Sequence, residues 1–106
     1  MANPWTGEVT LILDGQRHAM KLTLGALAEL EQGLQAGSLV ELVQRFESSA
    51  FSSGDVLALI VAGLRGGGHS VSAQDLLQAD IEGGPMAAAR AAAELLARAF
   101  MVPGQG

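Results

Sequence analysis

Residues 8–22, EVTLILDGQRHAMKL, form the stretch that decides the fold class. Two arms of strand-forming composition flank the dipeptide Asp14-Gly15. This dipeptide favours a two-residue type I′ turn, because both central positions of such a turn need positive φ. The stretch therefore predicts an antiparallel β-hairpin at the N-terminal end of the chain.

The pairing across this turn can be derived from the sequence. It places Leu11 opposite His18 and Val9 opposite Met20. Apolar side chains then share one face of the hairpin: Val9, Leu11, Met20 and Leu22. Ile12 falls on the other face, so we expect partial cover there too. An isolated hairpin is marginal in water, so its apolar face should pack on helices.

The remaining sequence carries start and stop signals for about five short helices. The expected helices cover residues 24–35, a segment after Ser38, a segment from Ser52 or Ser53 to Gly66, residues 73–81 and residues 85–101. Ser38 with Glu41 forms a capping box, as does Ser72 with Asp75. Glycines end several of these segments. The sequence thus predicts an α+β fold that is mainly helical.

Apolar spacing predicts which face each helix buries. In the first helix the expected face is Leu24, Leu27, Ala28 and Leu34; in the second it is Leu39, Leu42, Val43 and Phe46. The third helix is apolar around most of its circumference, so we expect it to be central. The alanine-rich fifth helix permits close contact, with Leu95, Leu96, Ala99 and Phe100 as larger contacts. The third and fifth helices should be the most buried.

The length of 106 residues fits one domain. We expect that domain to span residues 1–102, with a flexible tail at 103–106. Hydrophobic residues make up 49% and charged residues 16% of the chain, which is not the composition of a disordered protein. Cysteine is absent, which excludes disulfides and thiolate chemistry.

The net charge of −5 argues against nucleic acid as a partner. Six basic residues are scattered among eleven acidic ones, and a basic footprint is missing. No uninterrupted apolar run is long enough for a membrane span, and residues 1–7 do not resemble a signal peptide. We therefore expect a soluble cytoplasmic protein that binds neither membrane nor nucleic acid.

A search for catalytic, cofactor and metal sites predicts none. His18 and His69 have no partner residue at a suitable spacing. Residues 66–68 are three glycines, but the Lys-Ser/Thr that completes a phosphate loop does not follow. Asp75, with the later acidic residues, lacks the alternating ligands of a calcium loop. The sequence therefore predicts a protein that is not an enzyme and needs no cofactor.

Aromatic side chains are the remaining candidates for partner binding. Trp5 precedes the hairpin, and Phe46 and Phe51 flank the corner between the second and third helices. Large aromatic residues fill cores, but they are also enriched in binding hot spots. We expect a partner surface at Trp5 with the outer edge of the hairpin, and the Phe46–Phe51 corner is the alternative.

Five stretches of the chain resemble one family of small proteins. They are residues 3–9 (NPWTGEV), 22–31 (LTLGALAELE), 46–48 (FES), 55–68 (DVLALIVAGLRGGG) and 81–85 (IEGGP). The family belongs to gene transfer agents, which are phage-like particles made by alphaproteobacteria. The similarity covers residues 2–102. The family takes its name from the phage tail tube but is grouped with tail assembly chaperones.

This resemblance implies a non-enzymatic tail assembly protein in a bacterial cytoplasm. Its expected partners are the tape-measure and tail-tube proteins, and homo-oligomers are compatible with this role. A longer frameshifted product is a frequent feature of such chaperones. Two alternatives stay open: a structural tail component retained in the particle, and a small regulatory helical module. The family supplies no catalytic motif, so no residue inherits a catalytic role.

Overall fold

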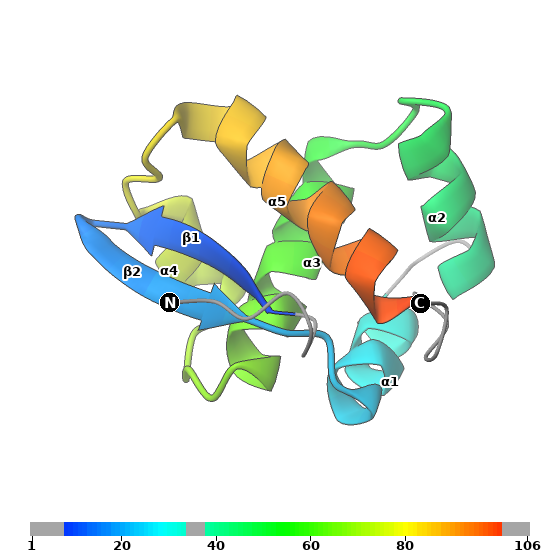
Figure 1. Cartoon of the computed structure of the whole chain (residues 1–106), viewed down its shortest axis with the longest axis horizontal. Helices are drawn as coiled ribbons and strands as arrows, with labels where there is room; N and C mark the ends of the chain where they lie inside the picture. Colours follow the sequence, from blue (N-terminus) through cyan, green and yellow to red (C-terminus); the bar gives the residue numbers. More distant parts are fainter. Residues whose placement is uncertain (1–7, 34–37, 101–106) are drawn as a thin grey trace, which may run out of the picture.

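The computed structural model describes residues 8–33 and 38–100 of the chain. The elements along the chain are β1 (Val9–Leu13), β2 (Gln16–Met20), α1 (Leu24–Gly33), α2 (Leu39–Glu47), α3 (Ser53–Gly66), α4 (Ala73–Leu77) and α5 (Gly84–Ala99) (Figure 1). A hairpin followed by five helices confirms the predicted mainly helical α+β fold. Trp5 and the predicted tail at 103–106 lie outside the described residues.

The hairpin has the predicted register. Val9 pairs with Met20 and Leu11 with His18 in an antiparallel arrangement. Asp14 and Gly15 have φ values of 51° and 80°, as a type I′ turn requires. All four residues predicted on the apolar face are buried: Val9, Leu11, Met20 and Leu22. Ile12 on the opposite face is half-buried, as expected.

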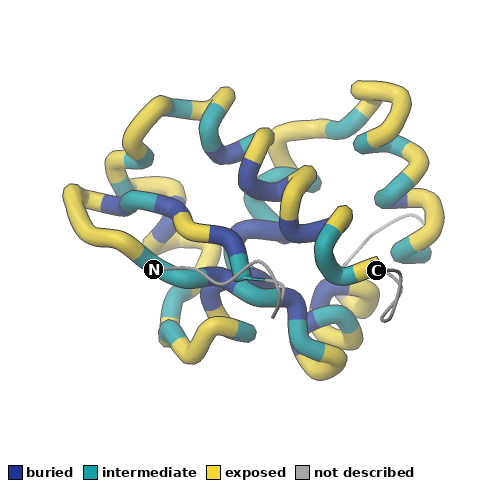
Figure 2. Tube along the Cα trace, viewed as in Figure 1, coloured by how far each residue is buried: buried dark blue, intermediate teal, exposed yellow. Residues whose placement is uncertain are grey.

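The central element is α3, which contacts α1, α4, α5 and β2. Its middle is buried inside the molecule, and α5 crosses in front of it (Figures 1 and 2). Leu59, Ile60 and Leu64 have no exposed surface. On α5 the buried residues are Ala88, Ala91, Ala92, Leu95 and Leu96. The prediction that these two helices are the most buried is confirmed. Phe100, expected as a core contact, is instead 49% exposed, because it follows the end of α5.

The backbone of β2 lies directly against the C-terminal end of α3. The Lys21 N–H donates a hydrogen bond of 2.9 Å to the carbonyl oxygen of Gly63. A Cβ on Gly66 would collide with the carbonyl oxygen of Lys21, and one on Gly67 with that of Ala19. The chain can approach this closely only because these positions carry no side chain. Gly66 and Gly67, which the sequence predicts to end the third helix, therefore also form a docking surface for the hairpin.

Local side-chain hydrogen bonds fix the starts of α1, α2, α3 and α4. Three helices begin with a capping box: Ser38 with Glu41, Ser52 with Asp55, and Ser72 with Asp75. Ser52, and not Ser53, is the cap of α3. At α1 the Thr23 hydroxyl accepts from the Ala26 N–H at 3.1 Å. Each start matches its sequence signal, since capping depends only on residues within one helical turn.

The predicted buried face of α1 is right at Leu27, which packs half-buried against the core, and wrong at Leu24 and Ala28. Leu24 is 84% exposed and Ala28 is also exposed, whereas Ala26 and Leu30 are buried and Leu34 lies outside the described residues. Ala26 approaches the C-terminal end of α3 beside Gly66. Such close contact selects a small side chain, so α1 presents the alanine and rotates Leu24 outwards.

The fourth helix ends at Leu77 and does not reach Ile81 as predicted. Ile81 instead forms an antiparallel bridge to Leu13. The Glu82 N–H donates to the Ile12 carbonyl at 3.0 Å, and the Asp14 N–H donates to the Asp80 carbonyl at 2.8 Å. These bonds replace a further helical turn. They also cover the outer edge of β1 near the turn, which is part of the hairpin edge expected as a partner surface.

The contact between β2 and α3 predicts a large effect of one methyl group. Gly66→Ala should lower the free energy of unfolding by about 1–3 kcal/mol, the usual cost of overpacking, because the new Cβ meets rigid backbone. Gly54→Ala in the same helix is the matched control. Its Cβ would meet only the Ser52 hydroxyl at 3.6 Å, so stability should stay equal or rise by up to about 1 kcal/mol. Urea denaturation measures both, and equal stability of the two variants would contradict the docking role.

Candidate functional site

An apolar groove lies between α3, α4 and the N-terminal half of α5. Its volume is about 710 Å³. The buried residues Ile60, Leu76 and Ala88 line it, one from each helix. Leu77 and Met86 also line it, and each is 70% exposed. Three helices thus surround an apolar depression that has two large side chains open to solvent.

The sequence explains why this groove is left unfilled. Helix α4 has only five residues, so it covers a small part of the N-terminal half of α3. The part of α5 that faces the groove supplies Ala88 and Ala89, which are too small to fill the space between the helices. The short helix α4 and the small side chains of α5 therefore leave apolar surface of α3 uncovered.

Asp80 is the one charged side chain among the groove-lining residues of the described chain. Asp14 holds its backbone on both sides: the Asp80 N–H donates to Asp14 Oδ1 at 2.9 Å, and its carbonyl accepts from the Asp14 N–H. None of the described basic side chains lines the groove. The groove therefore combines an apolar surface with one acidic residue whose backbone is held by Asp14.

Phe46 and Phe51, predicted as an alternative partner surface, lie together. Their rings stack with centroids 4.4 Å apart and planes 7° from parallel. Both are half-buried, and Phe51 lines the groove. The structure thus connects the Phe46–Phe51 corner to the groove, while Trp5 lies outside the described residues.

Three groove residues are not predicted from the sequence. Leu77 falls within the expected helix at 73–81 without an assigned role, and the sequence assigns neither Met86 nor Asp80 to a binding surface. The sequence signal that could have identified Leu77 is its position as an apolar residue at the end of a helix that is too short to bury it. Their common location follows from the packing of α4 and α5 on α3, which the sequence pattern does not specify.

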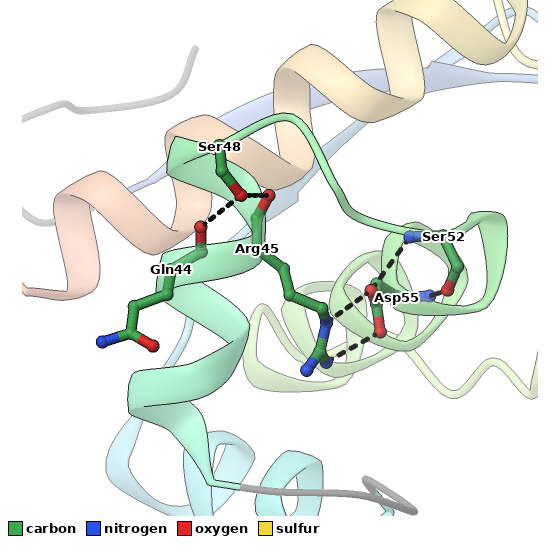
Figure 3. Close-up of polar contacts among 5 residues, drawn as sticks. All are labelled: Gln44, Arg45, Ser48, Ser52 and Asp55. Carbon is green, nitrogen blue, oxygen red and sulfur yellow. Dashed lines mark hydrogen bonds and ion pairs between the residues drawn. The ribbon is translucent and has the colours of Figure 1, made fainter.

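An ion pair joins α2 to the start of α3, at the corner that carries Phe46 and Phe51 in the sequence (Figure 3). Arg45 Nε donates to Asp55 Oδ2 at 3.0 Å, and Arg45 Nη2 donates to Asp55 Oδ1 at 3.1 Å. Asp55 Oδ2 also accepts from the Ser52 N–H at 2.9 Å. Such bidentate pairing constrains both the distance and the orientation of the two helices.

The pKa of Asp55 is lowered by this environment. Partial burial is the largest single effect and acts in the opposite direction, because it disfavours the charged carboxylate. The hydrogen bonds from Arg45 and Ser52, together with the positive charge of Arg45, outweigh it and hold the pKa of the Asp55 carboxyl below its ordinary value. The hydrogen bond to Asp55 likewise raises the pKa of Arg45.

The residues considered for catalysis or metal binding make contacts that stabilise the fold. His18 and His69 meet edge to face with ring centroids 4.9 Å apart, and Asp75 caps α4. Over residues 8–33 and 38–100, no group of three acidic or histidine side chains is placed to hold a metal ion. In the same part of the chain, every helix is too short or too polar to cross a membrane.

Comparison with known proteins gives one match. A family model described as "Phage tail tube protein, GTA-gp10" matches residues 6–102. No curated protein and no solved structure shows significant similarity to the chain. The match spans both the hairpin and the groove-forming helices, so it covers nearly the whole chain.

The lowered pKa of Asp55 predicts a specific acid dependence. Its ionised form contributes stability that is complete above the ordinary Asp pKa of about 3.9 and is lost as pH falls through the lower folded-state pKa. Asp55→Asn should therefore destabilise the protein most near neutral pH. The difference in unfolding free energy from the wild type should shrink below about pH 4.

Urea denaturation over a pH series measures this difference. Arg45→Met is the control, since it removes the partner that lowers the pKa of Asp55; the Asp55→Asn difference should depend less on pH in that background. A difference between wild type and Asp55→Asn that grows on acidification would contradict the assignment.

Proposed function

The chain belongs to the family described as phage tail tube protein, GTA-gp10, and from this membership we propose that it is a tail assembly protein of a gene transfer agent or phage-like particle. In this proposal it binds the tape-measure protein, the tail-tube protein or both while the tail is built. It acts without catalysis, as a chaperone-like factor in the bacterial cytoplasm. The family membership supports a tail-related role, and the groove supports a role in binding.

The groove is the observation that carries the binding role. Large apolar side chains are normally buried, and a contiguous apolar patch open to water commonly marks an interaction site. Leu77 and Met86 are both 70% exposed and line the same groove as buried apolar residues. A partner that covers them would remove this surface from water.

The hairpin favours recognition through helices over strand addition. The segment at Asp80 and Glu82 covers the outer edge of β1 near the turn. The end of β2 is docked on Gly63 of α3. A partner that adds a strand needs a free row of backbone groups, and part of that row is engaged at the turn and just after β2. The groove between helices therefore suits a partner better than the sheet does.

Aromatic residues extend the proposed surface. Phe51 borders the groove, and the ring of Phe46 stacks on the ring of Phe51. A partner in the groove would therefore contact the Phe46–Phe51 corner at one side. We keep Trp5 as a proposed second anchor, because tryptophan is enriched in binding hot spots. Its proposed role is tested by Trp5→Ala in a binding assay with thermal melting as control.

A structural tail component is the second candidate, favoured by the words "tail tube" in the family description. The two functions differ in whether the protein stays in the finished particle. Mass spectrometry of purified particles separates them. An assembly factor should be absent or far below stoichiometric amounts, whereas a structural component should be present in fixed ratio to the tail proteins.

Binding should depend on the groove. We expect the wild-type chain to capture the tape-measure or tail-tube protein in a pull-down from cells that produce particles. Met86→Glu should weaken capture at least about tenfold, because it places a second negative charge among the apolar residues that line the groove. Leu24→Glu is the matched control: Leu24 is another exposed large apolar residue, at 84%, but it lies on α1 away from the groove.

Circular dichroism and thermal melting should show both variants folded, since both side chains are mainly in water. Capture of neither tail protein by the wild type would contradict the proposed function. Equal loss of capture in Met86→Glu and Leu24→Glu would contradict the groove as the binding surface.

A further inference from the structure

The groove has two properties that together define an occupant. Its walls are apolar side chains from α3, α4 and α5, and its one charged lining side chain is Asp80. Within the described residues, no hydrogen bond or ion pair engages the Asp80 carboxylate. The backbone bonds to Asp14 hold the Asp80 backbone beside the groove, so its exposed carboxylate is available to a partner there.

The size and shape of the groove fit side chains from one helix. A volume of about 710 Å³ accepts several large apolar side chains. Exposed Leu77 and Met86 can contact the sides of a helix laid between them. An amphipathic helix in a groove uses apolar anchors at spacings of three and four residues, and polar residues stay outside.

We propose that the groove binds an amphipathic helix of the partner that carries a lysine or arginine next to its apolar face, with this basic side chain at Asp80. The proposal rests on the proposed function and names the chemistry of the partner segment. An anionic membrane does not fit, because Asp80 and the net charge of −5 repel it. A basic side chain at Asp80 places opposite charges at the border of an apolar contact, which fixes orientation more than it adds affinity.

Two synthetic peptides test the proposal without any tail protein. Both are amphipathic helices of about five turns with leucines at i, i+3, i+4 and i+7. One carries lysines beside the leucine face, and the other carries glutamates at the same positions. Titration into the ¹⁵N-labelled chain, followed by NMR, measures both the affinity and the residues whose amide signals shift.

The lysine peptide should bind more tightly, and its shifts should centre on the groove, at Leu57, Leu77 and Met86. The preference over the glutamate peptide should be about two- to fivefold, as a partly exposed charge pair allows. Asp80→Lys should reverse the preference. Glu82→Lys is the matched control, because it makes the same charge change two residues away and Glu82 does not line the groove; it should leave the lysine peptide preferred.

Four results would overturn the proposal. The first two are shifts that centre outside the groove and no binding of either peptide. The third is a preference that Asp80→Lys and Glu82→Lys change equally. The fourth is self-association that Met86→Glu abolishes, which would make a second copy the occupant. The pull-down with whole tail proteins is independent of these peptides. If the peptides fail but the pull-down still captures a tail protein, only the helix proposal is overturned. If the pull-down captures no tail protein, the result counts against the proposed function.

Discussion

The close approach of β2 to the C-terminal end of α3 is the contact on which the rest of the structure depends. Gly66 and Gly67 leave room for the backbone at Ala19 and Lys21, and the Lys21 N–H bonds to the Gly63 carbonyl. A Cβ on Gly63 would also meet a side-chain carbon of Leu95 at 2.7 Å, so the same glycine brings α5 close to α3. The hairpin and two helices thus share one junction, which fixes the central helix relative to the sheet.

The groove is a consequence of how that junction divides α3. Its C-terminal half is covered by β2, α1 and the large residues of α5. Its N-terminal half is left to a five-residue helix and the alanines at the start of α5, which fill less space. The Arg45–Asp55 pair then sets the Phe46–Phe51 corner at one side. The C-terminal half of α3 is therefore tightly packed, and its N-terminal half keeps an open apolar surface.

The sequence predicts those features that depend on neighbours along the chain. The Asp14-Gly15 turn fixes the hairpin register, and Ser-x-x-Asp/Glu patterns mark three helix starts. The sequence does not predict features that depend on contacts with backbone far away along the chain. Ala26 replaces Leu24 on the buried face because of Gly66, and Ile81 leaves the helix because Leu13 pairs with it. Within the candidate site, the Phe46–Phe51 corner is identifiable from sequence, while Leu77, Met86 and Asp80 meet only through tertiary packing.

The bond between Asp14 and Asp80 has a consequence for synthesis on the ribosome. It joins residues 66 positions apart, and the hairpin also relies on Gly63 of α3. The N-terminal strands therefore leave the exit tunnel before the segments that cover them have been made. A lone hairpin is marginal in water, so its final pairing waits for the second half of the chain. Translation delivers the sheet first, but the fold can close only when residues 63–82 have emerged.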